Sequence, residues 1–295
     1  MLTAREPLRL GVVVLTMGDR SLELSTLLDS VRAQEGESAT TVVLGQGVPV
    51  PDLPAGVHAV AMPENLGIPG GRNAGVQWLR EHAAVDVVVV LDDDGFLPAA
   101  DTFQKVREQF QENPRLGVIG FRIVDEDGHT ARRHVPRLGA SDPLRSSQVT
   151  TFLGGAHAIR MTVIDQVGGF ASAFFYSGEE TDFGWRALDA GWEIHYQANL
   201  TFRHPRTDPA RHAVYYRLTA RNRVWLARRN LPAVLVPVYL TAWVLYTLTL
   251  RPPLSGLRAW WSGFFEGIRV PCPPRHPIRW RTVWRMTRLG RPPVF

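Results

Sequence analysis

The sequence predicts an α/β protein with a mostly parallel sheet flanked by helices, followed by a helical, apolar C-terminal appendage. Short apolar runs rich in β-branched residues alternate with segments of helical periodicity, a pattern typical of a parallel sheet covered on both faces. Acidic residues directly follow the most apolar of these runs, and ligands of such sheets bind beyond the carboxyl ends of the strands. A charge-free stretch of 20 residues from Leu231 to Leu250 sets the last part of the chain apart.

Length and composition define the classes of protein to which the chain can belong. With 295 residues and 45% apolar content it has enough material for a full core, which excludes disordered and fibrous proteins. We predict one domain over residues 1–228 and a second region over residues 229–295. The net charge of +5 suits phosphates, anionic lipids or nucleic acid as partners.

Cysteine content and the N-terminus indicate a reducing compartment. Cys272 is the single cysteine, so an internal disulfide is excluded. The apolar stretch Gly11–Leu15 is too short for a signal-peptide core, and charges precede it within Met1–Leu10. We therefore expect the body of the protein in the cytoplasm.

The first half of the chain alternates strands and helices. Leu10–Leu15 (LGVVVL) is an apolar, β-branched run, and Thr16–Arg20 supplies turn and cap residues before a helical pattern at Leu22–Val31. The same reasoning predicts strands at Thr41–Leu44, Val57–Met62 and Val85–Leu91 (VDVVVVL), with a helix at Gly75–His82.

The second half of the first domain has a long polar interruption. Residues 125–147 are rich in Gly, Pro and Arg and are predicted to form a loop or an irregular hairpin. Around them we predict helices at Asp101–Glu112, Thr162–Val167 and Glu180–Ala190, strands at Gly117–Val124 and Glu193–Gln197, and regular structure at Thr150–Ile159.

The apolar segment Leu231–Leu250 is long enough for a bilayer core at about 1.5 Å per residue. Its prolines, Pro232 and Pro237, equally favour a helix that re-enters or lies on the membrane, and a buried helix is the third possibility. Tryptophan and phenylalanine residues mixed with arginines follow, as is typical of a lipid headgroup zone. The composition predicts membrane contact through residues 229–295.

Two acidic groups are the strongest chemical signals. Asp92 and Asp94 share one face of an extended segment, which favours a divalent cation and a diphosphate over a solvated acidic turn. Glu179, Glu180 and Asp182 open a predicted helix, where carboxylates also serve as caps. A carboxylate there is suited to take a proton from an attacking hydroxyl.

Two further segments carry candidate ligands. Residues 65–73 (NLGIPGGRN) are predicted to form a glycine-rich loop in which the backbone at Gly71 approaches a phosphate and Arg72 binds its oxygens. A tight turn before a helix is the alternative. His204 offers an imidazole, which is a ligand for Mn²⁺-like ions that also accept carboxylates.

In their order along the chain these segments resemble the family 2 inverting glycosyltransferases, which have the nucleotide-sugar-binding type A fold. The matching segments are Val12–Arg20, Asn65–Gly67, Gly71–Gly75, Leu91–Gly95, residues 154–156, residues 167–170, Glu179–Phe183 with Arg186, and Arg203-His204. Tyr215-Tyr216 and residues 221–223 are similar to the bacterial rhamnosyl and galactofuranosyl transferases of cell-wall and polysaccharide assembly.

The resemblance implies a role for each residue of the site. Glu180 is expected to be the catalytic base, and Asp92, Asp94 and His204 to hold Mn²⁺ or Mg²⁺. Donor contacts are expected from Thr16, Arg20, Gly71, Arg72, Asn73, Asp92 and Asp93, and acceptor or sugar contacts from Gly155, Glu179, Asp182 and Trp185. The chain departs from the family after the second strand, where it has Gly45-Gln46-Gly47 and a base-binding aspartate is common, and at Glu180, where the catalytic base is commonly Asp.

We therefore predict a metal-dependent hexosyltransferase at the cytoplasmic face of a bacterial cell membrane. Its donor is a UDP, dTDP or GDP sugar, its acceptor is a saccharide or lipid-linked hydroxyl, and nucleic acid is not expected as a partner. The alternatives are a sugar nucleotidyltransferase, whose Gly- and Lys-bearing signature is not found at Thr16–Arg20, and a non-enzymatic basic protein that binds membranes or nucleic acid.

Overall fold

A computed structural model describes residues 6–139, 142–206 and 213–294. The described residues do not include 1–5, 140–141, 207–212 and 295. The parts of the predicted N-terminal segment, polar loop, first domain and C-terminal region that fall on these residues therefore lie outside the description. The described part forms a mixed sheet in the order β3-β2-β1-β4-β7-β5-β8-β6. The strands are β1 (Leu10–Thr16), β2 (Thr40–Gly45), β3 (Val57–Ala61), β4 (Val87–Asp92), β5 (Leu116–Val124), β6 (Ser147–Gln148), β7 (Ala156–Arg160) and β8 (Glu193–Arg203).

The sheet has two parallel parts joined by one antiparallel strand. In the first part, β1 pairs in parallel with β2 and β4, and β2 pairs in parallel with β3. In the second, β5 and β8 are parallel, while β7 runs antiparallel to both β4 and β5. The carboxyl ends of β1, β2 and β4 therefore lie along one edge, as the parallel pattern predicts.

Alternating side chains of each strand fill two cores, one on each face. Val12 and Val14 belong to the core covered by α1 (Ser21–Arg32) and α3 (Thr102–Glu112). Val13 belongs to the core covered by α2 (Gly67–His82), α4 (Met161–Val167) and α5 (Glu179–Asp189). Full burial on both faces explains why these strands are apolar without interruption.

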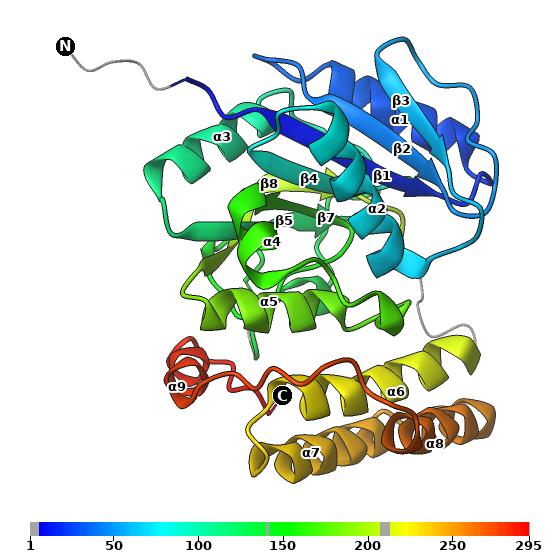
Figure 1. Cartoon of the computed structure of the whole chain (residues 1–295), viewed down its shortest axis with the longest axis vertical. Helices are drawn as coiled ribbons and strands as arrows, with labels where there is room; N and C mark the ends of the chain where they lie inside the picture. The colour runs from blue at the N-terminus through cyan, green and yellow to red at the C-terminus, as the bar shows by residue number, and fades with distance from the viewer. Residues whose placement is uncertain (1–5, 140–141, 207–212, 295) are drawn as a thin grey trace.

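Four C-terminal helices form a further layer below α5 (Figure 1). They are α6 (Ala213–Asn230), α7 (Leu235–Thr249), α8 (Leu254–Arg269) and α9 (Trp280–Arg288). Trp225, Tyr239 and Met286 join the same core as α5, so this layer packs on the sheet domain. Within the described ranges, no helix has both the length and the apolar character that a membrane crossing requires. The predicted boundary after residue 228 falls in the last turn of α6 and stays a prediction.

Two element predictions are corrected. Helix α2 begins at Gly67, so most of the loop predicted over residues 65–73 is helical. Its glycines bring the helix close to the sheet, since a Cβ on Gly75 would lie 2.4 Å from Val13 Cγ1. Strand β8 continues past the predicted end at Gln197 to Arg203, because it pairs with β5 along its length.

Candidate functional site

A cleft of about 810 Å³ opens at the carboxyl ends of β1, β2 and β4. Three of its acidic residues lie at this edge of the sheet, with Asp92 at the end of β4 and Asp93 and Asp94 directly after it. The remaining lining residues are Leu15, Thr16, Met17, Asp19, Arg20, Gln46, Asn65, Gly67, Ile68, Ile123, Arg133, His134, Leu153, Gly154, Gly155, Phe175, Tyr176 and His204. This is the edge of the sheet at which the sequence predicts a ligand.

Strand pairing brings His204 to the aspartates. Phe96 and Arg203 exchange backbone hydrogen bonds of 2.9 Å in each direction, which joins the segment after β4 to the end of β8. Gly95 permits this approach, because a Cβ there would lie 2.3 Å from the Phe202 ring. As a result, His204 Nε2 lies 3.0 Å from Asp94 Oδ1 and 3.7 Å from Asp92 Oδ2.

The three side chains have the chemistry and spacing of a cation site. Ligand atoms of Asp92, Asp94 and His204 all lie within 4.8 Å of one another. His204 Nδ1 lies 2.8 Å from the carbonyl oxygen of Pro205, and because a carbonyl only accepts, Nδ1 carries the hydrogen and leaves Nε2 for the aspartates. Two carboxylates and one imidazole fit Mn²⁺ or a similar ion.

Charges in the cleft shift the pKa of the histidine. Burial alone lowers the pKa of His204, but the hydrogen bond to Asp94 and the negative charges of Asp94 and Asp92 outweigh burial and raise it. Arg20 approaches the same group, with Nη1 at 2.6 Å from Asp94 Oδ2 and 3.5 Å from Asp93 Oδ1. The aspartates thus lie between His204, which follows β8, and Arg20, from the loop before α1.

The second acidic group converges on a buried arginine. Arg72 is 2% exposed, and its Nη1 lies 2.9 Å from Glu180 Oε1 and 3.5 Å from Glu179 Oε1. Its Nη2 donates to the carbonyl oxygen of Gly154 over 3.1 Å. Helix α2 turns this guanidinium inward to the carboxylates of α5, so the donor-phosphate contact expected of Arg72 stays a prediction.

The two glutamates differ in access. Glu179 is 1% exposed, and burial followed by the charge of Glu180 raises its pKa to about 8. The Glu180 side chain is 16% exposed. Glu180 is therefore the more accessible carboxylate of this pair, and it lies against Gly154, which lines the cleft, although neither glutamate is itself a lining residue.

A glycine pair joins the two acidic groups. A Cβ on Gly154 would lie 2.2 Å from Glu180 Oε1, and a Cβ on Gly155 would lie 3.1 Å from Asp92 Oδ2. Both glycines line the cleft, and Gly155 accepts a hydrogen bond from the backbone of Asp92. The carboxylates predicted to bind a cation and to take a proton thus flank adjacent residues of one wall.

The structure places four other predicted contacts away from the cleft. Asp182 is fully buried, and its carboxylate accepts hydrogen bonds from Arg186, Arg229 and Asn230. At roughly 100° per residue, Asp182 points about 200° around α5 from Glu180, so it faces the C-terminal layer. Trp185 lies on that side too, against Tyr239. Their predicted acceptor contacts stay predictions, and the contacts that the structure shows for both are with the C-terminal layer.

Gly71 and Asn73 contact other parts of the protein rather than the cleft. A Cβ on Gly71 would overlap the Gln46 amide, and Asn73 exchanges hydrogen bonds of 2.8 Å with the backbone of Phe170. Neither residue lines the cleft. The segment that carries both residues is a helix rather than a loop, and their donor contacts stay predictions.

The cleft contains residues to which the sequence assigned no ligand contact. Gln46 and Asn65 follow β2 and β3, and their place beyond strand ends is a signal that was available. Arg133 and His134 come from the polar loop, and no periodicity predicted their place. Burial and the charge of Arg133 lower the pKa of His134 to about 4.

The chain is similar to known proteins in part of its sequence and in its fold. Residues 46–182 match the family model described as Glycosyl transferase family 2. Among solved structures, GalNAc-T7 with UDP, GalNAc and Mn²⁺ superposes with a TM-score of 0.63 at 13% identity, over 92% of this chain and 60% of that chain. S. aureus TarS 1-349 gives 0.56 at 14% identity, over 88% and 81%.

The full S. aureus TarS structure gives a TM-score of 0.60 at 16% identity, over 89% of this chain and 49% of that chain. The chain thus spans only part of the length of GalNAc-T7 and of TarS. A sequence search of curated proteins finds no match. At these identities the structural likeness shows the fold, which is that of the type A glycosyltransferases.

Proposed function

We propose that the chain is a metal-dependent, inverting hexosyltransferase, because residues 46–182 match the model of Glycosyl transferase family 2 and the fold is that of the type A glycosyltransferases. The donor is a hexose or deoxyhexose on UDP, dTDP or GDP, and the acceptor is a saccharide or lipid-linked hydroxyl. The observation that carries the proposal is that Asp92, Asp94 and His204 have ligand atoms within 4.8 Å of one another, while Asp92 and Glu180 lie against the adjacent glycines Gly155 and Gly154.

Asp92, Asp94 and His204 would hold Mn²⁺ or Mg²⁺, which when bound stabilises negative charge on a departing diphosphate. Arg20 adds a guanidinium to the same part of the cleft and orients Asp94. Thr16, Arg20 and Asp93 line the donor side of the cleft. Gly155 keeps the wall beside Asp92 free of a side chain, so a sugar can lie close to the backbone.

Glu180 takes the proton from the acceptor hydroxyl as that oxygen bonds to the anomeric carbon. The bond from that carbon to the diphosphate oxygen breaks in the same in-line step, so the configuration inverts. Arg72 is a positioning residue, because its hydrogen bond of 2.9 Å fixes the Glu180 carboxylate beside Gly154. Glu179 is buried and forms a second ion pair with Arg72.

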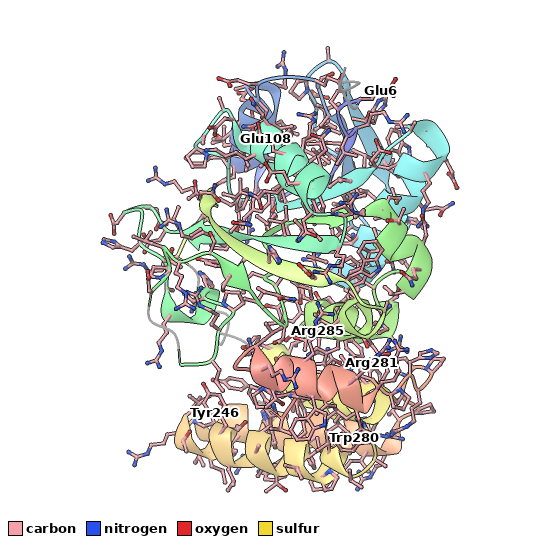
Figure 2. All side chains as sticks on the ribbon, turned by 90° about the vertical axis from the view of Figure 1, so that its left-hand side faces the viewer. Glu6, Glu108, Tyr246, Trp280, Arg281 and Arg285 are labelled. Atoms are coloured by element: carbon pink, nitrogen blue, oxygen red, sulfur yellow. The ribbon has the colours of Figure 1, made fainter. Side chains whose placement is uncertain are left out.

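The reaction belongs to cell-wall, polysaccharide or glycolipid assembly at the cytoplasmic face of a bacterial membrane. The support is the distribution of exposed apolar side chains, most of which lie on the C-terminal helices. Figure 2 shows Tyr246 and Trp280 in this layer, at the opposite end of the molecule from Glu6. Arginines such as Arg251, Arg258 and Arg269 accompany them and suit anionic lipid.

The test is a turnover screen of UDP, GDP and dTDP sugars with Mn²⁺ or Mg²⁺. The Glu180→Gln variant is expected to lose about 10²–10⁴-fold in kcat while KM for the donor changes little, since the base acts only in the chemical step. Glu81→Gln removes an exposed carboxylate of α2 and serves as the control. Near-normal turnover by Glu180→Gln contradicts the proposed mechanism.

A further inference from the structure

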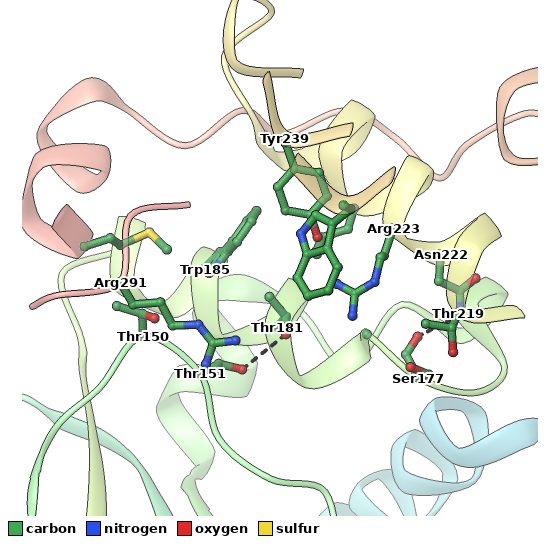
Figure 3. A pocket seen from close by; sticks show the side chains of 14 residues that line it. Thr150, Thr151, Ser177, Thr181, Trp185, Thr219, Asn222, Arg223, Tyr239 and Arg291 are labelled. Atoms are coloured by element: carbon green, nitrogen blue, oxygen red, sulfur yellow. Dashed lines mark hydrogen bonds between the residues drawn. The ribbon is translucent and has the colours of Figure 1, made fainter. Parts of the chain in front are cut away.

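A second pocket of about 140 Å³ lies where α5 meets the C-terminal layer. Its walls come from the segment after β6, from α5, α6 and α7, and from the end of α9 (Figure 3). None of its lining residues also lines the donor cleft. This second pocket is therefore separate from the site proposed for sugar transfer.

Two arginines enter the second pocket from different elements. Figure 3 shows Arg291, which follows α9, and Arg223 of α6 extending into it from opposite sides. The Arg223 guanidinium lies 3.1 Å from the centre of the Trp243 ring. Burial raises the pKa of Tyr239, and the charge of Arg223 lowers it. Burial, followed by the charge of Arg223, lowers the pKa of Arg291, against an opposing effect of Tyr239.

Arg223 and Arg291 are partly exposed and have no carboxylate partner in the part of the chain that the structure describes. Of the four arginines that are buried among the described residues, three have such a partner, and the fourth, Arg107, donates to the backbone carbonyl oxygens of Leu8 and Glu37. Arg72, Arg186 and Arg229 each pair with a glutamate or an aspartate. An arginine placed in a low-dielectric pocket without an anion costs stability, and placing a second one nearby adds repulsion. The arrangement suits a bound anion that neutralises both.

The second pocket is also lined by residues with polar side-chain atoms that have no hydrogen-bond partner among the described residues. Thr150 is 1% exposed and lines the pocket, yet its Oγ1 has no hydrogen-bond partner among the described residues. The same holds for Thr219 Oγ1 and Trp243 Nε1, which also belong to lining residues. Hydroxyl, indole and guanidinium groups are all donors to an oxyanion.

We propose that the second pocket binds a phosphoryl group, held by Arg223 and Arg291 and by donors that include the Thr150 hydroxyl. Paired guanidinium groups match the oxygens of a phosphate, because each presents several N–H donors in a fixed fork. The phosphate either is a free anion or belongs to a lipid phosphate whose chain follows the apolar wall of Leu226, Tyr239 and Trp243.

The test measures binding of inorganic phosphate by calorimetry in metal-free buffer, against chloride at equal ionic strength. Saturable binding is expected for the full-length chain, with a Kd at least about tenfold weaker in Arg291→Gln and in Arg223→Gln. Thr150→Val is also expected to weaken binding, and because its hydroxyl has no partner, this change leaves folding intact. A circular dichroism melt checks each variant.

Two control variants separate this pocket from other cationic sites. Arg288→Gln removes an exposed arginine from α9, and Arg20→Gln removes the arginine of the donor cleft. Both are expected to keep phosphate affinity. Equal loss in Arg288→Gln or in Arg20→Gln overturns the proposal, as does the absence of saturable binding to the wild type. Loss of sugar transfer in Arg20→Gln concerns the cleft alone.

A second arm distinguishes the two sources of phosphate. A short-chain prenyl phosphate is titrated beside the corresponding prenol and inorganic phosphate. Tighter binding of the prenyl phosphate than of inorganic phosphate, lost in Arg291→Gln, supports a lipid phosphate. Binding of inorganic phosphate alone supports a free anion. Equal binding of the prenol and the prenyl phosphate overturns a site for phosphate.

Discussion

Gly154 is the residue at which the geometry of the proposed base is most sensitive to substitution. A side chain there would meet Glu180 Oε1 at 2.2 Å and Arg72 Nη2 at 2.7 Å. Gly154→Ala is expected to displace both groups and lower kcat by about 10²-fold, since small displacements at a reacting centre are costly. Turnover and thermal midpoint are measured together.

Gly184→Ala is the matched control for this substitution. It adds a methyl group on the same helix as Glu180, where the nearest atom is Ile194 Cδ1 at 3.1 Å and no carboxylate is involved. This variant is expected to keep turnover. Full activity in Gly154→Ala, with its melting midpoint unchanged, contradicts the placement of Glu180 at the wall.

Glu179 links the site to the pH dependence of stability. Its pKa rises from 4.5 to about 8 in the folded chain, so between these values the folded state binds the proton more tightly than the unfolded state. The stability from this group is present below pH 4.5 and is lost as pH rises toward 8. In Glu179→Gln the thermal midpoint is expected to fall less between pH 6 and pH 8 than in the wild type; identical slopes contradict this.

At the level of single residues, proximity to a strand end decided which predictions matched the geometry. Asp92 and Asp94 follow a buried strand, and the family order of motifs added His204; all three line the cleft. Arg72 and Asp182 carry charges that suggested ligands, yet both are buried partners of other charges. Sequence alone does not separate a buried ion pair from a ligand contact, because both need the same residue types.

At the level of elements, the spacing of apolar residues and the length of each apolar segment predicted most strands and helices. Tertiary packing determines where these elements begin and end. The glycines of α2 lowered its predicted helix content, but they permit close contact with β1 and with Gln46. A glycine also permits close packing of α6 and α8, since a Cβ on Gly263 would overlap the backbone of Arg217. Local composition does not reveal such contacts because the partner is distant in sequence.

The exposed apolar side chains of α7 predict membrane binding by the C-terminal layer. Leu245 and Leu248 are 58% and 49% exposed. Replacing both with Ser is expected to reduce cosedimentation with vesicles of phosphatidylglycerol and phosphatidylethanolamine several-fold, because apolar burial drives interfacial binding. Leu22→Ser changes an exposed leucine of α1 and is expected to have no effect. Equal cosedimentation of all variants contradicts the proposed surface.

At the level of the whole molecule, the sheet, the cleft and the C-terminal layer form a continuous arrangement. Helix α5 has Glu180 on its cleft side and Asp182 on the side of α6, so the proposed base and the anchor of the C-terminal layer lie on one helix. The order of motifs predicted the fold class and the cleft edge. The second pocket was not predictable, since its residues come from five separate segments.

The most direct test of the central claim is a calorimetric titration of Mn²⁺ into the protein in the presence of UDP. The wild type is expected to bind one Mn²⁺ per chain, and Asp94→Asn and His204→Gln are expected to bind it at least about tenfold more weakly, because each loses one ligand. Unchanged Mn²⁺ affinity in both variants would contradict a shared cation at Asp92, Asp94 and His204.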